Sequence, residues 1–327
     1  MRIAVTGSIA TDHLMVFPGR FADQLIADRL DKVSLSFLAD DLVVRHGGVA
    51  ANIAFGLGRL GLRPLLVGAV GRDFTEYRAR LEEAGVDTAG VRVSDTRHTA
   101  RFVCTTDADQ NQIATFYAGA MAEAREIDLG TVRREAGGLD LVVVAPDDPE
   151  AMVRHTLDCR RSGTPFAADP SQQLARLDRD QVRRLVDGAR YLFTNEYEAA
   201  LLRDRTGWTE RRILGRVGTW ITTRGGDGVV IRRCGEQPLT VPAVPAAAPV
   251  DPTGVGDAFR AGFLAGTSWG WPLQRAAQLG CALATVVLES DGPQEYRPDA
   301  VDLLLRIDDA HGSAAAREIT PRLAGVA

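Results

Sequence analysis

Lysine is nearly absent from this chain of 327 residues, in which Lys32 is the only one. A phosphate-binding loop of the G-x-x-x-x-G-K-[ST] type places a lysine on the nucleotide phosphates, and protein kinases place one on a core strand. Neither pattern occurs here, so both of these enzyme classes are excluded. If the protein handles phosphate, then backbone amides, a metal ion or arginine must provide the positive charge.

Cysteine and long apolar runs are also scarce. The four cysteines lie far apart and form no C-x-x-C pair, which is typical of reduced thiols in a cytosolic protein. The first residues resemble a strand that enters a turn and not a targeting leader. The longest apolar stretch, 279–288, is about half of the ~20 residues that a membrane span needs. We therefore expect a soluble, cytoplasmic protein with no membrane partner.

The net charge and the spacing of the histidines argue against further classes of function. The formal net charge of -5 argues against nucleic acid as a partner, because phosphate backbones require a basic surface. The five histidines show no H-x-x-x-H spacing, so a histidine-ligated metal is not expected. The G-x-S-x-G motif of hydrolases and a strand-borne G-x-G-x-x-G motif for dinucleotides are also absent. The remaining expectation is a globular protein that acts on a small molecule.

Short apolar runs alternate with helical patterns over most of the chain, which is typical of an α/β fold with a mostly parallel sheet. Because the runs are continuously apolar, we expect helices to cover both faces of that sheet. The predicted strands are 2–8, 65–69, 141–145, 166–168, 191–194, 220–223 and 228–232. The predicted helices are 47–61 after its two glycines, 73–83, 149–162, 179–187, 196–206, 256–266, 272–288 and 299–311.

Two β-like segments interrupt this alternation. The first contains pieces at 12–17 and 32–37, and the second contains runs at 100–106 and 112–117 that flank a polar loop typical of a hairpin. We assign both segments, 9–45 and 97–119, to a small β-sheet lid that covers the substrate. The α/β core is then formed by 1–8, 46–96 and 120–327, and we expect it to carry the catalytic site.

Residues 251–257, with the sequence Asp-Pro-Thr-Gly-Val-Gly-Asp, form the most specific motif and precede a helical pattern. Glycines before a helix let several N–H groups point at one spot, where the helix dipole adds positive charge. The amides of Gly254, Val255, Gly256 and Asp257 would hold a transferring phosphoryl group without a lysine. Asp257 is the candidate base for an attacking alcohol. The alternative is a simple glycine turn in which Asp257 caps the helix.

Two motifs in this order, 47–54 (Gly-Gly-Val-Ala-Ala-Asn-Ile-Ala) and 251–257, resemble the two signatures of the ribokinase-like pfkB carbohydrate kinases. The resemblance covers essentially the whole chain and departs from the family pattern at Val255, where many members have alanine. Because a backbone amide acts at that position, the departure does not change the interpretation. The resemblance implies a doubly wound, mostly parallel α/β sheet flanked by helices, with a small β-sheet lid and an ATP site in the core.

The resemblance also implies roles for residues outside the catalytic motif. Asp12 matches a carboxylate that holds two ribose hydroxyls, and Gly48 and Asn52 match further sugar contacts. Asn195 and Glu198 match an N-x-x-E motif that organises Mg²⁺ and the ATP phosphates, although an ordinary capped helix start has the same pattern. The residues that match contacts to ATP in the family are Asn195, Thr223, Gly225, Gly226, Gly228 and Gly256.

Within the family, residues 5–14, 33–38 and 168–177 resemble bacterial adenosine kinases of the ribokinase type. Phe102 and Phe116 would stack on the purine, with ordinary lid core as the alternative for Phe116. Arg176 would neutralise charge on the γ-phosphate in place of the missing lysine. The residues that match the nucleoside pocket of those enzymes are Ser8, Ser36, Gln172 and Gln173.

These observations lead us to expect an ATP- and Mg²⁺-dependent adenosine kinase that phosphorylates the ribose 5′-hydroxyl, with Asp257 as the base. One alternative is another sugar kinase of the family, acting on ribose, fructose or a related substrate. A second alternative is a non-catalytic nucleotide-binding protein on the same fold. The resemblance also suggests K⁺ near Asp251 and 290–292, and the exposed lid favours a homodimer formed through it.

Overall fold

The computed structural model of the protein describes residues 1–25 and 35–323. Its largest element is a nine-stranded sheet in the order β13-β12-β11-β10-β9-β8-β1-β4-β5. The strands from β11 to β5 are parallel, and β12 and β13 are antiparallel additions at one edge. The strands are β1 (Ile3–Thr6), β4 (Leu65–Val70), β5 (Asp87–Val93), β8 (Leu141–Val144), β9 (Phe166–Ala168), β10 (Tyr191–Asn195), β11 (Thr219–Thr223), β12 (Val229–Arg232) and β13 (Leu239–Val241).

Helices cover both faces of this sheet, because each central strand is apolar on both sides. Within β1, Ile3 and Val5 pack into one hydrophobic core, whereas Ala4 packs into a second core on the other face. The helices of the first face are α2 (Val49–Arg59), α3 (Thr75–Glu83), α9 (Val255–Ser268), α10 (Leu273–Leu288), α11 (Ala300–His311) and α12 (Ser313–Leu323). Those of the second face are α4 (Leu129–Glu135), α5 (Pro149–Ser162), α6 (Arg179–Val186), α7 (Glu196–Thr206) and α8 (Glu210–Leu214). The predicted doubly wound α/β fold is confirmed.

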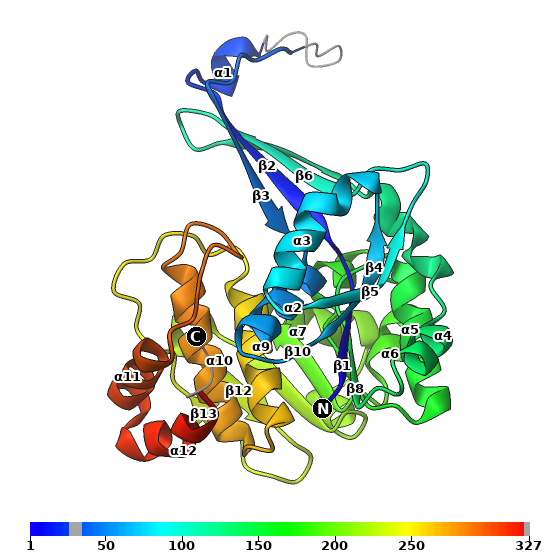
Figure 1. Cartoon of the computed structure of the whole chain (residues 1–327), viewed down its shortest axis with the longest axis vertical. Helices are drawn as coiled ribbons and strands as arrows, with labels where there is room; N and C mark the ends of the chain where they lie inside the picture. Colours follow the sequence, from blue (N-terminus) through cyan, green and yellow to red (C-terminus); the bar gives the residue numbers. More distant parts are fainter. Residues whose placement is uncertain (26–34, 324–327) are drawn as a thin grey trace.

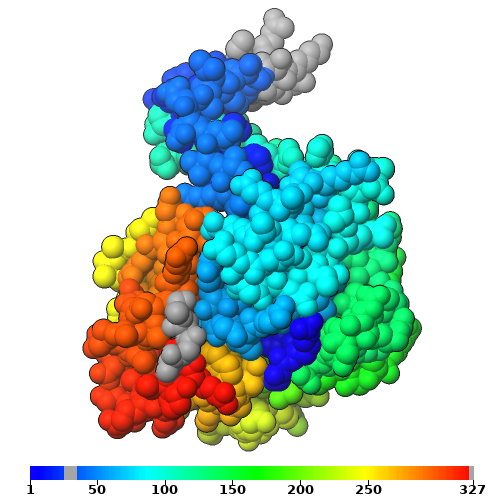
Figure 2. Space-filling view, viewed as in Figure 1, coloured from blue at the N-terminus to red at the C-terminus, as the bar shows by residue number. Residues whose placement is uncertain are grey.

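A separate four-stranded sheet, in the order β3-β2-β6-β7, projects from the core (Figure 1). Its strands are β2 (Ala10–Val16), β3 (Asp41–Gly47), β6 (Ala100–Thr106) and β7 (Gln112–Tyr117). The predicted hairpin of β6 and β7 forms, with Phe102 directly opposite Phe116. A single turn of helix, α1 (Phe21–Gln24), lies near the far end of this sheet. Figure 2 shows this sheet as a narrow projection above the broad α/β body.

Several predicted boundaries differ from the structure. The expected β-like piece 32–37 is partly outside the described residues, and its remaining part, 35–37, is not a strand. The small sheet instead takes β3 from residues that we had not assigned to a strand. The helix predicted to begin at Asp73 starts as a short 3-10 turn, Arg72–Phe74, before α3.

The structure contains several peripheral strands and helices that we did not predict from the sequence. The edge strand β5 has the sequence Asp-Thr-Ala-Gly-Val-Arg-Val, whose polar residues and glycine lower its β-propensity. It forms because β4 supplies hydrogen-bonding partners along its length. The other strands and α-helices missed there are β13, α1, α4, α8 and α12. Among the described residues, no helix combines the length and apolarity that crossing a membrane requires.

Candidate active site

A cavity of about 310 Å³ lies where the small sheet meets the carboxyl ends of the core strands. In parallel α/β sheets, ligands bind at this edge because the loops after the strands converge there. The loop after β1, the start of α2, the loop after β9 and the start of α9 all contribute to it. The predicted residues that line the cavity are Ser8, Asp12, Gly48, Asn52, Phe102, Phe116, Gln172, Gln173, Gly254 and Asp257. Residues separated by more than two hundred positions therefore share one pocket.

The N-terminus of α9 presents a cluster of backbone amide donors. Gly254 precedes the helix in the left-handed conformation, at φ 76°, and no side chain caps the helix end. In the described part of the chain, the amides of Gly254, Gly256 and Asp257 have no carbonyl or side-chain acceptor. The amide of Val255, which we also predicted to be available, instead donates to the carbonyl of Pro252 over 3.4 Å. A side chain at position 254 would collide with Pro293, since a Cβ atom there lies 2.5 Å from its Cβ. The motif therefore has the local geometry that an anion-binding nest requires.

Asp257 lies in the first turn of α9 and not at its cap, so the capping alternative for this residue is wrong. Its Oδ2 accepts a hydrogen bond of 2.9 Å from Nδ2 of Asn52. Burial raises the pKa of Asp257 to about 7, against the lowering effects of Arg260 and of the Asn52 hydrogen bond. A carboxylate with such a pKa is poised to accept a proton near neutral pH.

Arg260 is a buried residue of α9 whose charge acts on Asp257. It was not among the residues predicted from the sequence. Its guanidinium forms an ion pair with Asp169, whose exposed fraction is 0%, with an Nε–Oδ2 distance of 2.5 Å. It also donates to the carbonyl of Gly256 over 2.9 Å. An arginine in the otherwise apolar run Ala258–Phe263 was the available signal, because a buried helix face rarely carries an unpaired charge.

Asp12, on β2, also lines the cavity. Burial raises the pKa of Asp12 to about 6, and the nearby Arg45 opposes this shift. Gly48 has a φ of 96° and lies close to the backbone of Ser8. A Cβ atom at position 48 would lie 2.6 Å from the carbonyl oxygen of Ser8, so this approach requires glycine. Ser8 in turn accepts a hydrogen bond from the Val49 amide over 3.0 Å, so its hydroxyl holds the start of α2.

Arg45, on β3, joins the small sheet to the loops that contain Asp251 and Asp291. It pairs with Asp251 at 2.8 Å and with Asp291 at 2.5 Å. These carboxylates flank the region in which we predicted a monovalent cation. Asp251 also accepts from the amide of Thr253 over 2.8 Å. The guanidinium therefore holds the loop that leads into the amide nest.

The residues predicted to contact ATP lie along the same edge of the sheet but outside the cavity lining. Asn195 ends β10 and pairs in register with Thr223, the last residue of β11. Gly225 and Gly228 both have positive φ and frame a short turn after β11. The predicted loop residues thus belong to neighbouring loops at the carboxyl ends of adjacent strands. The predicted site residues that do not line this cavity are Ser36, which was assigned to the nucleoside pocket, and the residues assigned to ATP, Mg²⁺ or the phosphoryl group, namely Arg176, Asn195, Glu198, Thr223, Gly225, Gly226, Gly228, Val255 and Gly256.

Asn195 and Glu198 form a reciprocal capping box at the start of α7, as the structural alternative for this motif predicted. Burial and the charge of Asp169 raise the pKa of Glu198, and the charge of Arg260 opposes this shift. Within 1–25 and 35–323, no group of three or more acidic, histidine or cysteine side chains is arranged to hold a metal ion. Any Mg²⁺ near Glu198 would therefore take further ligands from water or a nucleotide.

Ser36 and Arg176 are both exposed. Ser36 lies in the segment between α1 and β3, and Arg176 follows the short turn Ser171–Ala175. In this structure neither residue lines the cavity that contains Asp257. Their assigned contacts with nucleoside and phosphate stay predictions.

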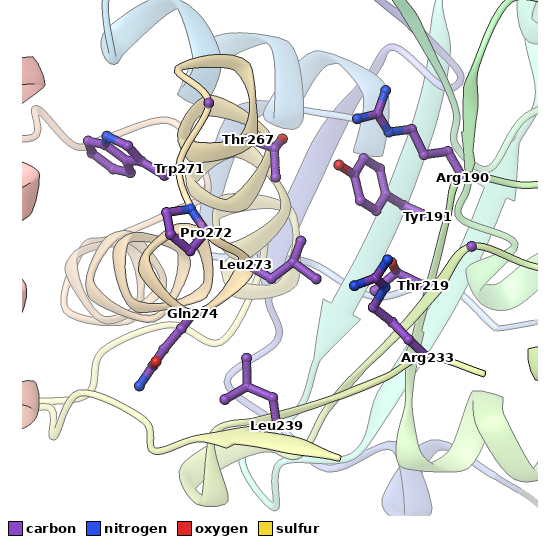
Figure 3. Close-up of a pocket in the computed structure, with 12 residues that line it drawn as sticks. Arg190, Tyr191, Thr219, Arg233, Leu239, Thr267, Trp271, Pro272, Leu273 and Gln274 are labelled. Atoms are coloured by element: carbon purple, nitrogen blue, oxygen red, sulfur yellow. The ribbon is translucent and has the colours of Figure 1, made fainter. Parts of the chain in front are cut away.

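A larger, more open cavity of about 760 Å³ lies at the opposite, amino end of the strands (Figure 3). Tyr191 and Thr219, which begin β10 and β11, face the start of α10 across it. Its lining includes Arg190 and Arg233 but no carboxylate, so it offers no base for an alcohol. The chemistry predicted from the sequence is therefore assigned to the smaller cavity.

Comparisons with known proteins show the family of the chain. The model of the pfkB family carbohydrate kinases matches residues 8–300. The nucleoside kinase of Methanothermobacter thermautotrophicus is 35% identical over 269 residues, which are 80% of this chain and 84% of that protein. The ribokinase of Bacillus subtilis is 26% identical over 300 residues, or 90% and 96% of the two chains.

A solved structure has the same architecture. The Burkholderia thailandensis nucleoside kinase, in complex with inosine, superposes with a TM-score of 0.83 at 37% identity. The alignment covers 95% of this chain and 97% of that one. The chain therefore belongs to the pfkB family of carbohydrate kinases, and it is a nucleoside or sugar kinase that transfers a phosphoryl group to an alcohol.

Proposed function

We propose that this kinase phosphorylates the ribose 5′-hydroxyl of adenosine, with ATP as the phosphoryl donor. The observation that carries the proposal is the cavity in which Asp257, Asp12 and the pair Phe102 and Phe116 meet. One carboxylate would serve the reacting hydroxyl, the other would hold ribose hydroxyls, and the two rings would bind a flat base. A cavity of about 310 Å³ lies at the small end of ligand sites, as a single nucleoside requires.

In the proposed reaction the 5′-oxygen attacks the γ-phosphorus of ATP in line with the leaving oxygen of ADP. The new O5′–P bond forms as the bond between the γ-phosphorus and its bridging oxygen breaks. The proton of the hydroxyl passes to Asp257. The amides of Gly254, Gly256 and Asp257 would receive the charge on the transferring group, and the N-terminus of α9 would strengthen that attraction.

ATP would lie along the edge formed by the loops after β10 and β11. Thr223, Gly225, Gly226 and Gly228 would contact its phosphates through backbone and hydroxyl donors. Mg²⁺ bound to those phosphates would neutralise part of their charge, with Asn195 and Glu198 holding its water ligands. Arg176, exposed beside the same edge, would approach the γ-phosphate when the nucleotide is bound.

The small sheet would act as a lid in this reaction. We assign it to 9–45 and 97–119, of which 26–34 lie outside the described residues, with the core formed by 1–8, 46–96 and 120–327. Closure over the nucleoside would exclude water and limit wasteful hydrolysis of ATP. Exposed apolar side chains on its edge strands, such as Leu42 at 55% and Ile113 at 45%, would pair with a second copy in a homodimer. A molar mass in solution equal to that of the monomer would contradict this dimer.

A panel of acceptors with coupled detection of ADP tests the substrate. It contains adenosine, inosine, cytidine, ribose and fructose, each titrated against fixed Mg²⁺ and ATP. We expect adenosine to give the highest kcat/KM. Higher kcat/KM for ribose or fructose would identify a sugar kinase of the family instead. ATP binding without release of ADP for every acceptor would favour a non-catalytic nucleotide-binding protein.

A further inference from the structure

A chain of buried hydrogen bonds leads from the end of β3 to the catalytic carboxylate. The hydroxyl of Tyr77 donates to the carbonyl of Gly47 over 2.9 Å. Nε2 of Gln294 donates to the Tyr77 oxygen at 2.5 Å and to Oδ1 of Asn52 at 2.8 Å. Asn52 then donates to Asp257 over 2.9 Å. Gln294 is 1% exposed and Tyr77 2%, so water does not compete for the bonds that these two side chains make.

The direction of every bond follows from the first one. A backbone carbonyl only accepts, so the Tyr77 hydroxyl must donate to Gly47 and its oxygen is left to accept. Gln294 must therefore present its NH₂ group, which has a second hydrogen for Oδ1 of Asn52. With its oxygen engaged, Asn52 can turn only its own NH₂ group toward Asp257. An amide flip at any point would set two acceptors or two donors against each other.

We propose that Gln294 is a positioning residue for phosphoryl transfer, which orients the Asn52 amide so that it always donates to Oδ2 of Asp257. One carboxylate oxygen is then held, and the other remains available for the substrate hydroxyl. Gln294 is absent from the residues that line the cavity, so it does not contact the space in which the nucleoside would bind. It acts through Asn52 alone. The inference rests on the proposed function, because it assigns the base of that reaction.

The chain also fits the electrostatics of the site. The Asn52 hydrogen bond is one of the two influences that lower the pKa of Asp257 against the effect of burial. A misoriented Asn52 would present its oxygen to the carboxylate, which favours the protonated form. Loss of Gln294 should therefore reduce turnover and move the acid limb of the pH profile to higher pH.

The central test compares Gln294→Met with wild type. Methionine has a similar length and no N–H groups, so it removes both donors with little change in volume. We expect kcat for the nucleoside to fall by about tenfold to a hundredfold, with a smaller change in KM. The acid limb of the plot of kcat against pH should shift to higher pH by about one unit. Glu295→Gln, at the adjacent exposed position, is the matched control and should keep the wild-type profile.

A double-mutant cycle with Asn52→Ala separates positioning from general loss of packing. If Gln294 acts only through Asn52, Gln294→Met should cost no more than about twofold in kcat once Asn52 is absent. Independent, multiplicative losses would overturn the proposal. So would a folded Gln294→Met variant with the wild-type kcat and pH profile.

Tyr77→Phe tests the same chain from its outer end if Gln294→Met does not fold. It removes the group that fixes the polarity of Gln294, and we expect the acid limb to move in the same direction by a smaller amount. An unchanged limb in this variant would contradict the directional chain. A wild-type enzyme inactive on every nucleoside would instead refute the proposed function, which these variants presuppose.

Discussion

Arg260 and Asp169 form a buried ion pair that joins α9 to the end of β9. The guanidinium lies over the ring of Phe193 at 5.6 Å and also binds the carbonyl of Gly256, within the amide nest. Its positive charge is one of the influences that lower the pKa of Asp257. The pair therefore links the position of the Gly256 carbonyl to the ionisation of Asp257.

We expect Arg260→Met to destabilise the protein strongly. Asp169 would remain buried without its partner, which costs about 3 to 5 kcal/mol in comparable sites. Urea unfolding monitored by fluorescence would measure the loss. The double variant Arg260→Met with Asp169→Leu should recover most of the stability, because an apolar pair has no charge to desolvate. A single variant as stable as wild type would show that the ion pair contributes nothing.

Asp257→Asn should remove the base and relieve a buried charge. We expect kcat to fall by about 10² to 10⁴, while nucleoside binding measured by calorimetry stays within about threefold of wild type. Wild-type turnover by this variant would refute the assigned mechanism.

The same variant should be more stable than wild type above neutral pH. Because the folded-state pKa of Asp257 lies above its ordinary value of 3.8, the contribution of this carboxyl to stability falls as pH rises from about 4 to about 7. Asparagine carries no charge, so Asp257→Asn escapes this loss. At pH 8 we expect a gain of about 1 to 3 kcal/mol in the free energy of unfolding, which should vanish near pH 4.

The pH dependence of kcat/KM should report two carboxylates. Asp257 accepts a proton only when ionised, so activity should fall below its pKa of about 7. Asp12, whose pKa is about 6, should be ionised to bind ribose hydroxyls most strongly. The logarithmic slope should therefore approach one between these values and two below them. A profile that is flat down to pH 5 would contradict both assignments.

Alanine at Phe102 or Phe116 should weaken nucleoside binding selectively. Loss of one stacking ring costs about 1 to 3 kcal/mol, so KM for adenosine should rise about fivefold to more than a hundredfold. Ile113→Ala is a matched control, since an odd spacing from Phe116 along β7 places the two side chains on opposite faces. If all three variants keep the wild-type KM, the lid rings do not contact the base.

Arg45 provides a test of the predicted monovalent cation. Its guanidinium already lies between Asp251 and Asp291, where such a cation would be held. We expect kcat to change less than about twofold when K⁺ is replaced by tetramethylammonium at constant ionic strength. Arg45→Gln should lower kcat and gain a response to K⁺, because the two carboxylates are then unpaired. Strong K⁺ activation of the wild type would instead support the original prediction.

The sequence by itself determined the elements and motifs whose signals are local. Continuous apolar runs and helical periodicity gave the central strands and most of the helices, because burial imposes those patterns on neighbouring residues. Residues 251–257 determined their own turn, since only glycine adopts the conformation of Gly254 beside Pro293. The strand β3 and the edge strand β5 escaped prediction, because their formation depends on pairing with β2 and β4.

Only the tertiary structure decided which side chains meet. The contact of Asn52 with Asp257 spans 205 positions, and that of Gln294 with Asn52 spans 242. The partners of Arg260 and Arg45 were equally invisible, because an arginine has the same appearance in a sequence whether it is solvated or paired. Hydrogen bonds and ion pairs act over a few ångströms in space, and the distance along the chain carries no record of that closeness.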